Sequence, residues 1–228
     1  DYPTPIANNA VTSVKNADAT YTIYSFMGIT DPPNRLTITD AAYKLTLPGG
    51  TWQPIAPAPR MQAPGTGDLL PKIAANAITI AGEVYLVGGY INRFGREFTE
   101  KRLFRYTPTT DDYTQLADVP VEVDDTVTGV YQDRYLYLIS GWHGPTNNNR
   151  PNVQLYDSVA DTWQQATPIP GPSSGLFGHS GTIIGVLLDA RQRRGKSTFR
   201  QAREAFPEAE MVHHFRLLGG GLQVVPGL

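Results

Sequence analysis

A small set of polar and aromatic side chains carries the chemistry that this sequence could perform on a ligand. Amide and guanidinium groups suit sugar hydroxyls and carboxylates, and an exposed indole suits the apolar face of a sugar ring. Residues of these types are also common in solvated turns, so a purely structural role stays open. The candidate ligand-binding residues are Asn92, Arg93, Asp124, Asp125, Trp142, His143 and His179.

None of these residues forms a recognisable catalytic pair. Asp124 and Asp125 are adjacent, and adjacent side chains of an extended strand point to opposite sides, so they do not form a general acid and base pair by themselves. A lone histidine such as His179 is more often a hydrogen-bonded structural group than a base. The catalytic residues are therefore unknown, and the sequence leaves open whether the protein is an enzyme.

Composition excludes several kinds of chemistry. The chain has 228 residues, no cysteine and a formal net charge of −2 at pH 7. Without cysteine there are no disulfides, thiolate zinc sites, iron–sulfur clusters or cysteine nucleophiles. The small net charge offers no strong field for nucleic acid, and no apolar stretch reaches the ~18 residues of a membrane span. We expect no cofactor, no metal, and neither nucleic acid nor membrane as a partner.

Two further features are weak signals. Gly195-Lys196-Ser197-Thr198 resembles the end of a phosphate-binding loop, but Ala190 stands where the motif needs its first glycine, so that function is excluded. The chain begins at Asp1 without a basic or apolar leader, which fits a processed exported protein and an internal fragment equally well. The compartment and the oligomeric state stay open.

Three segments of the chain repeat one layout. In each, an apolar run ends in glycine, and a polar loop, a strand with tyrosine, a short turn and an aromatic residue follow. The spacings between equivalent landmarks change together along the chain, which indicates a true repeat. The landmarks are Gly28, Gly89 and Gly141, then Tyr43, Tyr106 and Tyr156, then Trp52, Tyr113 and Trp163.

Each repeat predicts four strands. Runs such as 84–87 and 135–139 are apolar without alternation, which is typical of strands buried on both faces. The predicted strands are 10–14, 21–27, 38–45 and 52–55 in the first repeat, 74–80, 83–87, 101–106 and 113–116 in the second, and 126–131, 134–139, 152–156 and 163–166 in the third. A fourth repeat begins at 177–184, and the pattern then stops.

The repeat resembles that of the kelch and galactose oxidase-like β-propeller family. A period near 50 residues is typical of kelch repeats, and the most specific signatures are the YLVGG sequence at 85–89 and the DTW sequence at 161–163. The resemblance covers about residues 10–185 and implies an all-β arc of about three four-stranded blades. It also implies that the loops 30–37, 91–100 and 142–151 lie on one face, around the mouth of a central channel.

The end of the chain departs from this pattern. Residues 186–228 contain 7 Lys and Arg against 4 Asp and Glu, and the run 197–210 has roughly helical spacing. We expect kelch blades over 1–185 and a basic tail without kelch repeats, partly helical or disordered, over 186–228. Because propellers close with about 4–8 blades, three blades form an incomplete propeller.

The resemblance implies two functions. The first is a scaffold that binds a carbohydrate or a protein partner through the loops on one face, with Trp142 stacking on a sugar and Arg93 favouring anionic sugars. The alternative is a sugar-active enzyme similar to sialic-acid mutarotases and epimerases. The copper site of galactose oxidase needs a tyrosine cross-linked to cysteine, so the resemblance does not extend to that activity. Convergence of His179, Asp124 and the loop arginines on one pocket would favour the enzyme.

Overall fold

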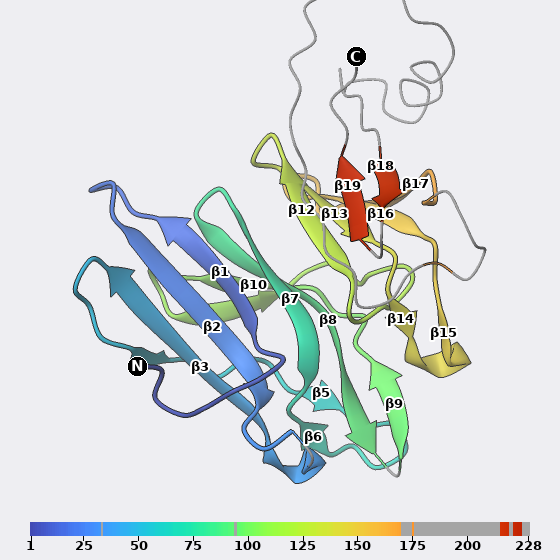
Figure 1. Ribbon diagram of the computed structural model, residues 1–228, viewed down its shortest axis with the longest axis horizontal. Coiled ribbons are helices and arrows are strands. Elements are labelled where there is room, and N and C mark those ends of the chain that lie inside the picture. Colours follow the sequence, from blue (N-terminus) through green and yellow to red (C-terminus); the bar gives the residue numbers. More distant parts are fainter. Residues whose placement is uncertain (33, 94, 170–174, 176–214, 219–220, 225–228) are drawn as a thin grey trace, which may run out of the picture.

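Three antiparallel sheets lie side by side in the computed structural model, which describes residues 1–32, 34–93, 95–169, 175, 215–218 and 221–224 (Figure 1). Each sheet contains four strands that are paired in the order of the chain, and the second sheet gains a fifth strand. The first sheet contains β1 (Ala10–Lys15), β2 (Tyr21–Ile29), β3 (Ile38–Leu47) and β4 (Gln53–Ile55). The second contains β7 (Ile73–Ile80), β8 (Glu83–Arg93), β10 (Phe104–Thr107) and β11 (Asp112–Gln115), and the third contains β12 (Val127–Tyr131), β13 (Tyr135–Ile139), β16 (Val153–Asp157) and β17 (Thr162–Ala166).

The predicted all-β fold class is confirmed, and each predicted strand is present with its ends shifted by a few residues at most, except for β8. That strand continues to Arg93 and turns back as β9 (Arg96–Thr99), so much of the predicted loop 91–100 is a hairpin. The predicted loop 142–151 likewise contains β14 (Trp142–His143), the short helix η2 (Gly144–Thr146) and β15 (Asn148–Asn149). The remaining short elements are η1 (Arg35–Thr37), β5 (Met61–Gln62) and β6 (Leu69–Leu70).

The end of the chain is described only in part. The predicted fourth repeat at 177–184 and the predicted helical run at 197–210 lie outside the described residues. The described part of 186–228 is an antiparallel pair, β18 (Phe215–Leu218) and β19 (Gly221–Val224). The sequence did not predict this pair, in which the backbone groups of the two segments bond to each other.

The core lies between neighbouring sheets. Leu86 of the second sheet packs in one cluster with Phe26 of the first, while the adjacent Val87 packs in another cluster with Leu138 of the third. All four side chains are fully buried. Strands of the middle sheet therefore bury both faces, which explains why their sequences are apolar without alternation.

A repeated set of hydrogen bonds, called here the inter-sheet clasp, ties each sheet to the one before it. Asp161 of the third sheet accepts hydrogen bonds from the hydroxyl of Tyr156 (2.8 Å) and from the backbone N–H of Ala117 (2.9 Å). The indole N–H of Trp163 donates to the carbonyl of the same Ala117 (3.0 Å). The first and second sheets are joined in the same way by Tyr106, Asp111, Tyr113 and Ala56.

The first sheet keeps one clasp position, Trp52, which corresponds to Tyr113 and Trp163, and lacks the tyrosine and the aspartate. Tyr43 pairs with Ser25 and Pro54, so it matches Phe104, which pairs with Leu86 and Gln115, and the predicted equivalence of Tyr43 with Tyr106 is wrong. Tyr43 lies nine residues before Trp52, whereas Tyr106 lies seven residues before Tyr113. Because of this two-residue difference, Tyr43 occupies the position two residues before the one that corresponds to Tyr106. The positions that correspond to Tyr106 and Asp111 are Leu45 and Gly50.

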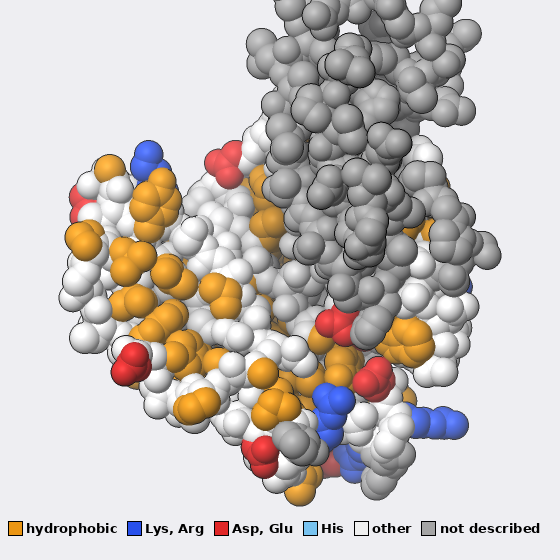
Figure 2. All heavy atoms as spheres, viewed as in Figure 1, with side chains coloured by type: hydrophobic (Ala, Val, Ile, Leu, Met, Phe, Trp, Pro, Cys, Tyr) orange, Lys and Arg blue, Asp and Glu red, His pale blue; other side chains and the backbone are white. Residues whose placement is uncertain are grey.

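The outer face of the first sheet is apolar and partly covered by the start of the chain. The ring of Tyr2 lies edge-on to Trp52, with ring centroids 4.8 Å apart. Val11, Tyr21 and Leu47 of this sheet are 50%, 48% and 40% exposed, and Figure 2 shows hydrophobic side chains gathered over β1–β3. This face is therefore more exposed than its equivalents in the second and third sheets, which pack on a neighbour.

Replacing Asp161 by alanine is expected to lower the free energy of unfolding by about 2 kcal/mol, because two hydrogen bonds to a charged acceptor are lost. Asp161 also adopts a left-handed conformation (φ 52°), which asparagine tolerates better than alanine. Asp161→Asn keeps an acceptor oxygen and is the matched control. If urea unfolding gives the same loss of unfolding free energy for both variants, the clasp does not stabilise the contact between the second and third sheets.

Candidate functional site

A polar pocket lies where the inner strands of the three sheets begin. It has a volume of about 220 Å³ and is lined by Asn8, Asn9, Ala74, Ala75, Asn76, Asp125 and Thr126. Three segments far apart in the sequence meet there because β1, β7 and β12 run next to one another. The backbone N–H of Ala74 donates to the carbonyl of Asn8, and that of Asp125 donates to the carbonyl of Ala74, each over 3.4 Å. These bonds link the three sheets around the pocket.

Hydrogen bonds hold the polar side chains of the pocket in place. The amide of Asn76 donates to the carbonyl of Thr126 over 3.2 Å, and the amide of Asn9 donates to the hydroxyl of Ser25 over 2.8 Å. The hydroxyl of Thr126 donates to the carbonyl of Ile139 over 2.9 Å. The pocket therefore presents oriented amides together with the carboxylate of Asp125, on β7 and on the segments that lead directly into β1 and β12.

Close backbone contact at a glycine defines the position of Asp124. Gly141 has a φ of 125°, and a Cβ atom there would lie 2.6 Å from the carbonyl oxygen of Asp124. The same approach joins Gly28 to Ala7 and Gly89 to Ile73, at 2.9 and 2.7 Å. Asp124 thus occupies a position that is Ala or Ile in the other sheets, and a carboxyl group there departs from the repeat.

The carboxyl group of Asp124 is fully buried, with 0% exposure. Its Oδ2 accepts a hydrogen bond from the hydroxyl of Thr99 over 3.1 Å, and its Oδ1 has no hydrogen-bond partner among the described residues. Burial raises the pKa of Asp124 to about 8, and the neighbouring charges of Asp125 and Glu97 contribute to this shift. The carboxyl group of Asp124 is therefore largely protonated at neutral pH. Its neighbour Asp125 is the residue of the two that lines the pocket.

Four other predicted site residues that the structure describes, Asn92, Arg93, Trp142 and His143, are not part of the pocket lining. Arg93 is held by Asp68 and Thr66, whose oxygens are 2.6 and 2.7 Å from its Nη1. Asn92 precedes it on β8 and pairs with Glu97. The guanidinium of Arg93 is thus already neutralised, which removes the basis for expecting it to select anionic sugars.

Trp142 and His143 form β14 next to Asp124. The backbone of Trp142 exchanges two hydrogen bonds of 2.9 Å with that of Asp124, and Trp142 is half-buried. His143 Nε2 lies 3.7 Å from Glu122, and burial lowers the pKa of His143. His179 lies outside the described residues.

Sequence analysis missed the pocket asparagines and the threonine. Asn8, Asn9, Asn76 and Thr126 stand at or just before the start of an inner strand, where the repeat otherwise has small or apolar residues. Polar residues at these three equivalent strand starts are a signal in the sequence, because the inner strands converge in the fold that the repeat predicts.

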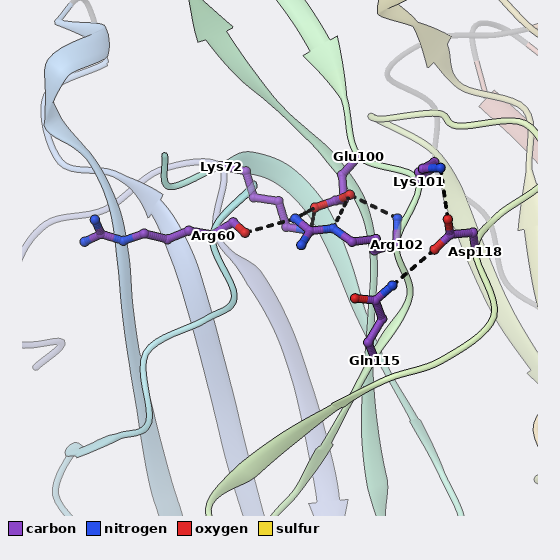
Figure 3. Close-up of polar contacts among 7 residues, drawn as sticks. All are labelled: Arg60, Lys72, Glu100, Lys101, Arg102, Gln115 and Asp118. Carbon is purple, nitrogen blue, oxygen red and sulfur yellow. Dashed lines mark hydrogen bonds and ion pairs between the residues drawn. The ribbon is translucent and has the colours of Figure 1, made fainter. Parts of the chain in front are cut away.

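A buried ionic cluster lies between the first two sheets (Figure 3). Lys72 is 1% exposed, and its Nζ lies 3.7 Å from the carboxylate of Glu100. Arg102 makes two hydrogen bonds to the same carboxylate, at 3.0 and 2.6 Å, and a third to the carbonyl of Arg60 at 2.9 Å. The cluster fixes the loop before β5 to the second sheet. Its charged groups interact with one another, so they are not offered to a ligand.

Neither a metal site nor a membrane helix emerges from the described ranges. No three His, Asp or Glu side chains there are close enough together to hold a metal ion. In the same ranges, no helix is long and apolar enough to cross a membrane.

The four-stranded sheets, their glycine contacts and the clasp define a β-propeller architecture. Comparison with solved structures agrees, since the structure of YjhT superposes with a TM-score of 0.57 and 18% identity over 76% of this chain and 54% of that chain. In sequence the chain is similar to part of several kelch-like proteins. It is 28% identical over 106 residues to Kelch-like protein 15 from Gallus gallus, and 28% identical over 141 residues to Kelch-like protein terF from Aspergillus terreus.

These matches cover only part of each protein. They span 46% and 60% of this chain, and 20% and 29% of the two curated relatives. No family model matches the chain. The comparisons thus agree with the fold and the repeat.

Proposed function

We propose that the protein is a kelch-type binding module that holds a carbohydrate in the pocket at the start of the inner strands. The observation that carries this proposal is the lining of that pocket, in which Asn8, Asn9, Asn76, Asp125 and Thr126 meet from three sheets. Amide and hydroxyl groups both donate and accept hydrogen bonds, and a carboxylate accepts them, so together they suit sugar hydroxyls.

The size of the pocket supports a small ligand. Its volume of about 220 Å³ lies below the ~300–1,000 Å³ of sites for drug-sized molecules. It corresponds to about seven water molecules at ~30 Å³ each, which suits one sugar ring rather than a chain of sugars. Because the polar groups are fixed by hydrogen bonds, little side-chain entropy is lost when a ligand binds.

Binding is favoured here over the alternative of a sugar mutarotase or epimerase. Such an enzyme needs an acid and a base that both reach the ligand. Asp125 is the one ionisable residue in the lining, and Asp124 is fully buried behind it. The described residues therefore offer one ionisable group at the ligand, which suits recognition better than turnover.

A protein partner is a second candidate, supported by a different observation. Leu36 and Leu69 are 93% and 59% exposed, in segments joined to the end of β8. Arg35, next to Leu36, donates to the hydroxyl of Tyr90 over 2.9 Å, and Asp68, next to Leu69, pairs with Arg93. These two leucines would be the apolar anchors of a protein interface, and Leu36→Asp would weaken it without affecting the pocket.

Replacing Asn76 by alanine is expected to weaken binding of a monosaccharide about tenfold or more, because one oriented amide is lost from the pocket (~1.4 kcal/mol). Isothermal titration calorimetry with a panel of monosaccharides measures this on the full chain. Asn148→Ala, an exposed asparagine on β15, is the matched control and should leave affinity unchanged. If no monosaccharide binds at millimolar concentration, or if both variants bind like the parent, the carbohydrate proposal is wrong.

A further inference from the structure

We propose that the ligand of this pocket carries a protonated amine, so that its chemical class is an amino sugar whose ammonium group pairs with Asp125. This inference rests on the proposed carbohydrate function and makes it more specific. It opposes the expectation from sequence that Arg93 would favour anionic sugars.

The charge of the pocket lining is the first observation. Among the described residues, Asp125 is the one charged residue of the lining, and neither lysine nor arginine belongs to it. The two arginines at the end of β8 have partners elsewhere, since Arg93 pairs with Asp68 at 2.6 Å and Arg35 donates to Tyr90 at 2.9 Å. An anionic ligand would therefore meet a carboxylate without a compensating cation, which is unfavourable in a partly enclosed site.

The surroundings of Asp125 are the second observation. Burial and the nearby carboxylate of Glu97 raise the pKa of Asp125, which means that its negative charge is poorly compensated. The adjacent Asp124 is fully buried and has an oxygen without a partner among the described residues. A cation bound at Asp125 would compensate the negative charge of this carboxylate and of the nearby Glu97.

The nature of the cation follows from what surrounds it. Within the described ranges, no group of acidic or histidine side chains is close enough together to hold a metal ion, so an organic cation fits better. The amides of Asn8, Asn9 and Asn76 and the hydroxyl of Thr126 surround the carboxylate. They suit the hydroxyls beside an amine on a sugar ring, whereas a simple alkylamine would leave them without ligand partners.

Calorimetric titration of the full chain with glucosamine, glucose and glucuronic acid near neutral pH tests the inference. We expect glucosamine to bind about tenfold more tightly than glucose, and glucuronic acid to bind more weakly than either. Methylamine, which has the charge without the hydroxyls, should bind about tenfold more weakly than glucosamine. Added salt should weaken the binding of glucosamine and leave that of glucose nearly unchanged.

Two variants of Asp125 and one control complete the test. Asp125→Asn should weaken the binding of glucosamine more than that of glucose and so abolish the preference, and Asp125→Glu should restore much of the preference. Asp112→Asn removes one exposed negative charge at the opposite end of the second sheet and should change nothing. Far-ultraviolet circular dichroism establishes that each variant folds.

The outcomes separate this inference from the function on which it rests. If glucose or glucuronic acid binds at least as tightly as glucosamine, or if methylamine matches glucosamine, the amino-sugar inference is overturned while the pocket stays a binding site. A preference that survives in Asp125→Asn also overturns it. If none of the three sugars binds, the proposed carbohydrate function itself fails.

Discussion

Replacing Glu100 by alanine is expected to lower the free energy of unfolding by about 3–5 kcal/mol, because the change leaves buried positive charge without its carboxylate. Lys72 and Glu100 are 1% and 2% exposed, and Arg102 depends on the same carboxylate. Burial would favour the neutral acid, yet Lys72 and Arg102 outweigh it and hold the pKa of Glu100 below its usual value. Urea unfolding near neutral pH measures the loss.

The matched variant for this cluster is Lys72→Met. The variant removes the buried ammonium and keeps an apolar side chain of similar length, and Arg102 still neutralises Glu100, so we expect a smaller loss than for Glu100→Ala. Burial lowers the pKa of Lys72 from 10.5 to about 8, so the folded state binds fewer protons than the unfolded state between these values. Stability should therefore rise with pH from about 8 to 10.5, and Lys72→Met should remove that rise. Equal losses for Glu100→Ala and Lys72→Met would contradict this account.

Raising the pH from about 5 to 8 is expected to lower the free energy of unfolding by about 3 kcal/mol through Asp124 alone. Its pKa is about 8 in the folded protein against an ordinary value of 3.8. The folded state thus binds more protons than the unfolded state between these values, and stability falls as pH rises through this range. The groups that face Asp124 are Thr99, Asp125 and Glu97.

Asp124→Asn isolates this contribution. The amide is nearly isosteric with the protonated acid and does not ionise. The free energy of unfolding of the variant should therefore change less than that of the parent between pH 5 and 8. Asp112→Asn, at an exposed position, is the control and should follow the parent. Urea unfolding at several pH values gives the comparison, and a parent and Asp124→Asn with the same pH dependence would show that Asp124 ionises normally.

The strands could be predicted because burial on both faces leaves a strong signal. A run such as 84–87 has no polar residue at all, and its glycine end marks where the backbone of Ile73 passes. The extension of β8 into β9 was missed because most residues of the segment 92–99 are polar, which is typical of a loop. Their pairing is set by the hairpin at Gly95, not by a hydrophobic pattern.

The candidate site was found only in part, for a related reason. Asp124 and Asp125 were identified as residues at the mouth of the channel, but residue type does not tell which of the two is buried. The role of Lys72 was not visible either, since lysine is usually exposed and its partner Glu100 is 28 positions away in the sequence. The pocket asparagines become neighbours only when three strands converge.

The inter-sheet clasp gives the stack of sheets a polarity. Each clasp joins residues of one sheet to the loop that follows the last strand of the sheet before it. The two faces of a sheet are therefore different, and one face of a sheet packs on the opposite face of its neighbour. Contacts of this type are heterologous, and repeating them generates rings or open filaments rather than two-fold pairs. Because Leu45 and Gly50 replace the tyrosine and aspartate, a further sheet stacked on the first would lack the hydrogen bonds that these two residues make and would depend on Trp52 and on packing against Tyr43.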